Sequence, residues 1–116
     1  MKVQILLNIS RDSFFGFDNT FSPAVLRNVL TYEVAVTAST SVGSILEQAF
    51  EQLNVGGEPG YPATEWCKFY RLNGNRSLSK GDVVIVGETA FSCESAGWKR
   101  QTTDAILAAL NAEVSA

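Results

Sequence analysis

The sequence predicts an α+β fold: a mixed sheet of four to six strands packed by one amphipathic helix, with a short C-terminal helix. Three observations support it: apolar alternation at the start, a helical stripe in the middle, and a continuous apolar run near residue 83. The 116 residues are 46% hydrophobic, which suits one globular domain. We expect that domain over residues 1–101, with an insertion loop over 10–28, and a helical appendage over 102–116.

The first two strands are predicted from period-two alternation. Apolar side chains alternate with polar ones over residues 3–9, with Leu6 the single exception. Residues 30–38 alternate in the same way and are rich in β-branched side chains, which favour strands. Glycine, proline and small polar residues interrupt any period between these segments, so residues 10–28 are predicted to be a loop.

The middle of the chain carries the strongest helical pattern. Ser39, Thr40 and Ser41 can each cap a helix, because a side-chain oxygen accepts a free backbone N–H. Gly56 and Gly57 can end it, since glycine tolerates a positive φ. The apolar stripe between these signals consists of Val42, Ile45, Leu46, Ala49, Phe50 and Leu53.

The second half of the chain is predicted to form further strands. Residues 66–72 are aromatic and apolar, and the Asn73-Gly74 pair after them is typical of a tight turn. The apolar run 83–86 suits a central strand buried on both faces. Residues 89–93 and 98–101 would add strands after it. A closing helix, capped by Thr102 or Thr103, would carry its apolar side chains on one side: Ile106, Leu107, Leu110 and Val114.

Residues 69–74 and 76–86 resemble the second half of ubiquitin-like and sulfur-carrier β-grasp proteins. The shared features are a strand with a tight turn, a leucine-bearing turn ending in Gly-Asp, and a final central strand. The resemblance spans roughly residues 2–94. It implies that the first and last strands lie together, parallel, in the middle of the sheet, with the helix across one face.

A carrier function follows from this resemblance only with processing of the chain. Such carriers end in Gly-Gly just after the last strand, whereas the single Gly-Gly of this chain, at 56–57, lies at a predicted helix end. A sulfur carrier or ubiquitin-like modifier would therefore require cleavage after Gly87 or Gly97.

Composition argues against catalysis and against bound cofactors. The chain contains no histidine, which excludes Ser-His-Asp and Cys-His catalysis and His-containing zinc sites. The two cysteines, Cys67 and Cys93, are too few for a four-cysteine cluster and are expected to be small buried hydrophobes. We therefore predict no enzymatic activity, cofactor or metal.

Charge and hydropathy limit the partners. A net charge of −3 argues against a nucleic-acid backbone as the main partner. No apolar run reaches the ~20 residues that a membrane span needs, so no membrane partner is expected. The prediction is a cytoplasmic protein that binds another protein, or that forms a homo-oligomer.

The loop is the first candidate binding surface. Four of the seven phenylalanines, Phe14, Phe15, Phe17 and Phe21, lie within eight residues of it. They would form either an aromatic contact surface, since aromatics dominate binding hot spots, or a small satellite core under the loop. A division of the four between these roles stays open.

A basic stretch is the second candidate surface. Four bases and no acid lie between Trp66 and Gly81, and Arg71 and Arg76 among them could contact an acidic partner. Such a run also suits the solvated face of a hairpin. Trp98 either joins the binding surface or packs on the end of the central strand.

The leading hypothesis is a non-enzymatic protein–protein interaction module, an adaptor or accessory factor of the kind encoded by phages and mobile elements. The alternatives are the processed carrier and a structural subunit that self-assembles through an open sheet edge.

Overall fold

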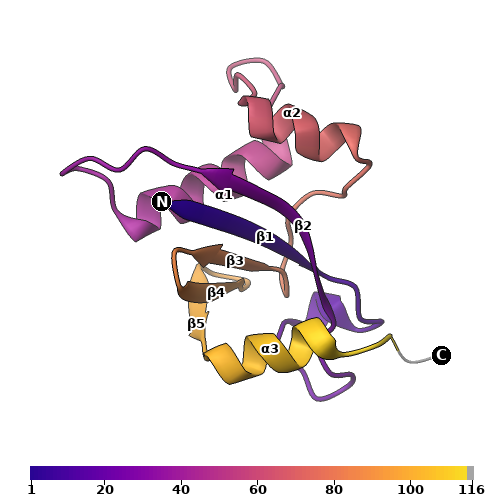
Figure 1. Ribbon diagram of the computed structural model, residues 1–116. Coiled ribbons are helices and arrows are strands. Elements are labelled where there is room, and N and C mark those ends of the chain that lie inside the picture. Colours follow the sequence, from indigo (N-terminus) through magenta and orange to yellow (C-terminus); the bar gives the residue numbers. More distant parts are fainter. Residues whose placement is uncertain (115–116) are drawn as a thin grey trace.

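Residues 1–114 are described by the structure, a computed structural model. Among them, five strands form one antiparallel sheet in the order β2-β1-β3-β4-β5. Two helices lie on one face of this sheet and a third lies on the other (Figure 1). The strands are β1 (Lys2–Asn8), β2 (Leu26–Glu33), β3 (Val83–Val86), β4 (Thr89–Cys93) and β5 (Trp98–Gln101), and the helices are α1 (Val42–Val55), α2 (Glu65–Leu72) and α3 (Thr103–Asn111).

The sheet separates two apolar cores. The α+β class and the strand number agree with the sequence prediction. Leu6 is the apolar exception to the alternation in β1, and its side chain packs in the core on the α3 side of the sheet. The larger core, under α1 and α2, includes Val3, Ile5, Leu7, Leu30, Tyr32, Ile45, Leu46, Ala49, Leu53, Tyr70, Val84 and Val86, and the smaller one contains Leu6, Phe17, Leu26, Val83, Ala90, Ile106 and Ala109.

β3 is the predicted central strand. Val84 and Val86 face the larger core, while Val83 faces the smaller one. The strand therefore requires apolar side chains on both faces, as a continuous apolar run indicates. β3 also lies in the middle of the sheet order.

The prediction of a mixed sheet with a parallel central pair was wrong. β1 pairs with β3 in antiparallel register, with Val3 opposite Val86 and Ile5 opposite Val84. The chain leaves β2, crosses over β1 by way of α1 and α2, and enters β3 running parallel to β2. Since β2 is antiparallel to β1, and β3 is parallel to β2, β3 is antiparallel to β1. The expected β-grasp pairing is therefore absent from the described sheet.

The prediction of a strand over residues 66–72 was also wrong, because this segment is helix α2. Thr64 caps the helix, its Oγ1 accepting from the backbone N–H of Cys67 at 3.1 Å, and Glu65 lies in the first turn. Cys67 and Tyr70, three residues apart, both reach the interior. The cap and this helical spacing outweigh the strand propensity of the aromatic residues. Gly74, at φ 76°, follows the helix end instead of turning a hairpin.

The remaining elements match the sequence with shifted boundaries. Ser41 is the cap of α1, and its side chain accepts from the N–H of Ser44. β2 lies four residues earlier than predicted at its start, so the connection between β1 and β2 covers residues 9–25. The helix expected in the C-terminal appendage is α3, which begins after its cap Thr102 and buries Ile106 and Ala109 against the sheet.

Candidate functional site

The connection over residues 9–25, hereafter the aromatic loop, is closed at its base by Asn8. The Asn8 side-chain oxygen accepts hydrogen bonds from Ser10 Oγ at 2.8 Å and from the backbone N–H of Val25 at 3.3 Å. The N–H of Ile9 donates to the carbonyl of Val25 at 2.8 Å. Asn8 is almost fully buried. The two ends of the loop are thus held together as a compact surface loop, a type that is frequently functional.

Asn19 organises the interior of the aromatic loop. Its side-chain oxygen accepts from the backbone N–H groups of Phe21 and Ser22 at 2.9 and 3.0 Å. Its side-chain NH₂ donates to the carbonyls of Gly16 and Asp12 at 2.7 and 3.2 Å. One amide side chain therefore satisfies four backbone groups, and the loop has a defined backbone path without belonging to the sheet.

Two further contacts attach the loop to the domain. Phe17 is 7% exposed and packs in the smaller core with Ile106. Asp18 accepts from Lys99 Nζ at 2.8 Å and from Gln101 Nε2 at 2.9 Å, which connects the loop to β5. Partial burial raises the pKa of Asp18, but the hydrogen bonds from Lys99 and Gln101 outweigh this effect, and the pKa lies below its ordinary value.

The other three phenylalanines form an exposed aromatic cluster. Phe14, Phe15 and Phe21 are 65%, 46% and 64% exposed. The ring centroids of Phe14 and Phe15 lie 4.2 Å apart, and those of Phe15 and Phe21 lie 4.6 Å apart. Ser13–Phe15 forms one short 3-10 turn, which presents the first two rings. The four phenylalanines are therefore divided, with one in the core and three in contact with each other at the surface.

A hollow of ≈ 180 Å³ borders this cluster beside Phe21. Arg11 and Pro23 line it from the loop, and Ala112 lines it from the segment after α3. The hollow has both apolar and charged walls. It is large enough to accept one side chain of a partner next to the aromatic rings.

No family model, curated protein or solved structure matches this chain. Its function is therefore inferred from the chemistry of its own surface.

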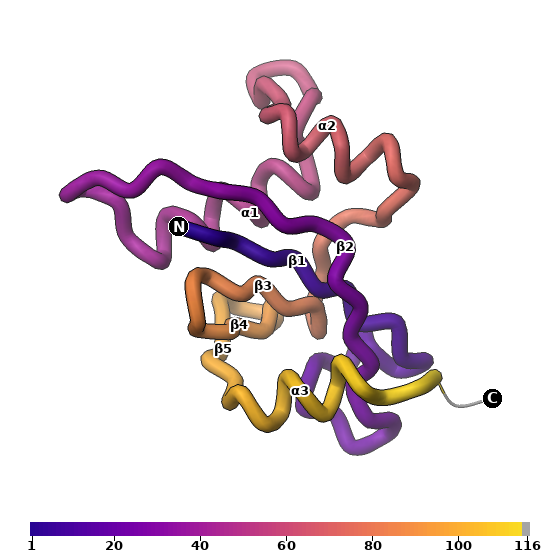
Figure 2. Tube along the Cα trace, viewed as in Figure 1, coloured from indigo at the N-terminus to yellow at the C-terminus, as the bar shows by residue number. Residues whose placement is uncertain are grey.

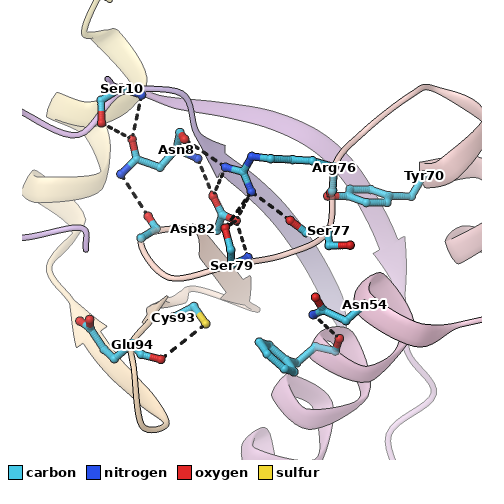
Figure 3. Close-up of polar contacts among 12 residues, drawn as sticks. Asn8, Ser10, Asn54, Tyr70, Arg76, Ser77, Ser79, Asp82, Cys93 and Glu94 are labelled. Carbon is cyan, nitrogen blue, oxygen red and sulfur yellow. Dashed lines mark hydrogen bonds and ion pairs between the residues drawn. The ribbon is translucent and has the colours of Figure 1, made fainter. Parts of the chain in front are cut away.

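Arg76, predicted to bind a partner, makes several contacts within the chain (Figure 3). Its guanidinium makes two hydrogen bonds to the carboxylate of Asp82, at 2.6 and 2.7 Å, and donates to the Asn8 carbonyl at 3.1 Å. Asp82 is fully buried and also accepts from the backbone N–H groups of Asn8 and Ser79. The hydrogen bonds to Asp82 raise the pKa of Arg76 above its ordinary value. Tyr70 donates from its hydroxyl to the Arg76 carbonyl.

The other predicted contact residues have separate locations. Arg71 is exposed on α2, and only its Nη2 approaches a carbonyl, that of Gln52, at 3.4 Å. Trp98 is half-buried against the larger core and meets the ring of Phe50 edge-on, with the centroids 6.4 Å apart. Neither residue lines the hollow beside the aromatic cluster. The sequence-predicted residues therefore fall into one aromatic cluster and several unrelated places.

The glycines required by a carrier function lie in the connections between strands of the sheet. Gly87 is in the turn between β3 and β4, and Gly97 immediately precedes β5. Cleavage after Gly97 would remove β5 and α3, and cleavage after Gly87 would remove β4 as well. Either cut would expose the smaller core, to which Ala90, Ile106 and Ala109 belong.

Within residues 1–114, no group of three or more metal-ligating side chains is close enough to hold an ion. No helix in this range combines the length and the apolar character that a bilayer span requires. Cys67 and Cys93 are both free thiols and buried.

Sequence reasoning missed the residues that shape the site. Asn8 and Asn19 fix the loop, and the Arg76–Asp82 pair fixes the segment beside it, yet each acts through contacts that period and propensity do not encode. Asn19 had one local signal, because asparagine often hydrogen-bonds the backbone two or three residues ahead. The Arg76–Asp82 pair spans six residues of turn, and nothing local distinguishes it from two solvated charges.

Proposed function

We propose that this chain is a non-enzymatic binding module that recognises another protein through Phe14, Phe15 and Phe21. The observation that carries the proposal is their exposure in mutual contact on a loop that is itself tightly hydrogen-bonded. Clustered exposed aromatics are unusual on a monomer and are typical of contact surfaces. An adaptor or accessory factor is the class of protein that fits this arrangement.

The loop supports binding because it is organised before a partner arrives. Ordering a loop at an interface costs free energy, and a loop that is already ordered avoids most of that cost. Asn8 holds the base of the loop, Asn19 holds its interior, and Phe17 anchors it in the smaller core. Aromatic side chains also bury a large area while losing few rotamers, which suits a small contact surface.

Self-assembly through the sheet edge has less support. β2 is an edge strand of eight residues, but its register against β1 shifts between Ile5 and Leu6. Such a bulge twists an edge and discourages pairing with another chain.

The test compares two variants that differ in which phenylalanines they remove. Phe15→Ser with Phe21→Ser disrupts the exposed cluster, and we expect the melting temperature to stay within about 3 °C of the wild type, because surface changes cost little. Capture of a specific partner from lysate of the native host, identified by mass spectrometry, should be lost. Tyr61→Ser, a partly exposed aromatic outside the loop, is the matched control and should keep that partner.

Phe17→Ala should affect stability, unlike the variant that removes the exposed rings. We expect it to lower the free energy of unfolding by about 3 kcal/mol, as removal of a buried aromatic ring does. If the double serine variant retained the same partner as the wild type, the aromatic cluster would not be the binding surface. If that variant were as unstable as Phe17→Ala, its rings would belong to the core.

A further inference from the structure

Helix α2 exposes an apolar pair on its outer side. Phe69 is 57% exposed and Leu72 is 85% exposed, the highest value among the large hydrophobic side chains of residues 1–114. They lie three residues apart on the helix, and side chains at this spacing are neighbours on the helix surface. A single exposed apolar residue needs no explanation, whereas an adjacent pair on a two-turn helix does.

The packing of the opposite side of α2 keeps Phe69 and Leu72 on the outer surface of the helix. Cys67 and Tyr70 are fully buried, and Trp66 stacks on Tyr32 with a centroid distance of 4.0 Å and an interplanar angle of 9°. Any rotation that buried Phe69 or Leu72 would expose these three side chains. The exposure of the pair therefore follows from the fold.

Basic residues adjoin the apolar pair. Lys68 contacts Glu65 at 3.1 Å, but both side chains are largely exposed, at 58% and 92%. Pairs of this kind contribute little, so Lys68 can exchange to another carboxylate at low cost. Arg71, three residues further along α2, is exposed, and its guanidinium contacts only the carbonyl of Gln52, at 3.4 Å, within residues 1–114.

The local charge is opposite to that of the whole protein. On helix α2 the exposed bases Lys68 and Arg71 outnumber the single acid, Glu65, whereas the chain has a net charge of −3. A long anionic surface, such as a nucleic-acid duplex or an acidic bilayer, would meet the repulsion of the whole chain. A short acidic segment would meet only α2, where Lys68 and Arg71 are exposed.

We propose that the outer face of α2 is a second docking surface, which binds an acidic, amphipathic segment of a partner protein. Carboxylates of that segment would contact Lys68 and Arg71, while its apolar side chains would cover Phe69 and Leu72. In Figure 2, α2 and the aromatic loop lie at opposite ends of the trace, the loop beside α3. The two surfaces can therefore be occupied at the same time, and this proposal does not depend on the first.

The experiment uses three synthetic peptides and the full chain labelled with ¹⁵N. Each peptide has three Leu-Glu-Glu-Leu repeats, or the same repeats with Gln or with Lys replacing Glu. We expect the acidic peptide to shift the amide resonances of residues 65–72. We expect it to bind about tenfold more tightly than the Gln peptide, the ratio expected from two exposed ion pairs of up to ~1 kcal/mol each.

Variants assign the binding to α2. Lys68→Glu with Arg71→Glu should weaken the acidic peptide about tenfold, and Leu72→Ser should weaken all binding on this face. Lys2→Glu with Arg100→Glu changes the same number of exposed bases elsewhere and should leave affinity unchanged. The dispersion of the amide spectrum reports whether each variant is folded.

Several results would overturn the proposal. The absence of shifts in α2 at millimolar acidic peptide is one, and equal affinity for the acidic and Gln peptides is another. Shifts confined to residues 13–21 would assign the peptide to the aromatic cluster. Leu72-dependent sedimentation with phosphatidylserine vesicles, without peptide binding, would make the face a lipid contact. The Phe15→Ser, Phe21→Ser variant should bind the acidic peptide normally, so failure of either proposal can be recognised separately.

Discussion

At the scale of single residues, the Asp82 carboxylate is the charged group whose burial most requires hydrogen-bond partners. It is fully buried, and a buried charge is tolerated only when it is paired and hydrogen-bonded. Arg76 supplies two hydrogen bonds and the backbone of Asn8 and Ser79 supplies two more. The pair joins the segment before β3 to the end of β1, and it thereby supports the base of the aromatic loop.

Removing the arginine should therefore destabilise the fold. We expect Arg76→Ala to lower the free energy of unfolding by about 3 kcal/mol, because it leaves an uncompensated buried charge. Arg76→Lys keeps the charge but loses the two-point geometry, so an intermediate loss is expected. Urea unfolding followed by circular dichroism measures both. Arg100→Ala, at an exposed arginine of β5, is the control and should cost less than about 0.5 kcal/mol. Equal effects of Arg76→Ala and Arg100→Ala would show that Asp82 does not need its partner.

At the scale of elements, the aromatic loop packs on the turn before β3 through one glycine. Gly81 has φ 94°, and a Cβ there would overlap the carbonyl oxygen of Ser13. Gly74 also has a positive φ, 76°, but no atom lies within 4 Å of where its Cβ would be. Alanine at Gly74 would introduce backbone strain alone, whereas alanine at Gly81 would introduce the same strain and also displace the loop. Comparing the two therefore gives the free-energy cost of each effect.

Alanine at these positions should have unequal effects. Gly74→Ala should cost about 1 kcal/mol, from left-handed backbone strain alone. Gly81→Ala adds the clash with Ser13, and we expect a loss of about 3 kcal/mol or more, as overpacking adds a further 1–3 kcal/mol. Because the clash pushes the loop away, chymotrypsin should cleave faster near Phe15 and Phe21 in the Gly81 variant only. Equal cleavage rates in the two variants would mean that the loop does not depend on this contact.

The two helices between β2 and β3 show, at the element scale, what local sequence patterns predict. Helix α1 was predicted because its cap and its stripe are local signals. For residues 66–72 the sequence predicts a strand, since Trp66, Phe69 and Tyr70 favour strands in isolation. The helical state of α2 depends on Thr64 as a cap and on a buried side that packs against β2 and α1, and only the assembled molecule supplies that packing.

At the scale of the whole molecule, burial sets the response to alkaline pH. Burial, with a smaller contribution from Asp82, raises the pKa of the Cys93 thiol to about 11 and that of the Tyr70 hydroxyl to about 12. Burial also raises the pKa of Tyr32 above its ordinary value. All three groups hold their protons more tightly in the folded state than in the unfolded chain.

Stability should therefore fall as the pH rises above about 9, where the unfolded chain begins to lose the cysteine proton while the folded chain keeps it. From Cys93 alone, the loss between pH 7 and pH 10 should be on the order of 1 kcal/mol. Urea unfolding at the two pH values measures it, and Cys93→Ala should reduce the difference by a similar amount. Equal stability of the wild type at pH 7 and pH 10 would contradict the assignment of these groups as buried.

Several features of this protein follow from interactions between residues close together in the chain. These are the α+β class, the alternation of β1, helix α1 with its cap, the two-sided burial of β3, and an overlong loop rich in phenylalanine. Period and capping are short-range properties, so they can be read without knowing the fold. Three other features depend on the assembled fold: β3 runs antiparallel to β1, residues 65–72 are helical, and Arg76 faces Asp82. The burial of Phe17 and the exposure of Phe14, Phe15 and Phe21 also depend on the assembled fold. These outcomes depend on which distant segments meet, because burial and pairing are set by the partners that the fold brings together.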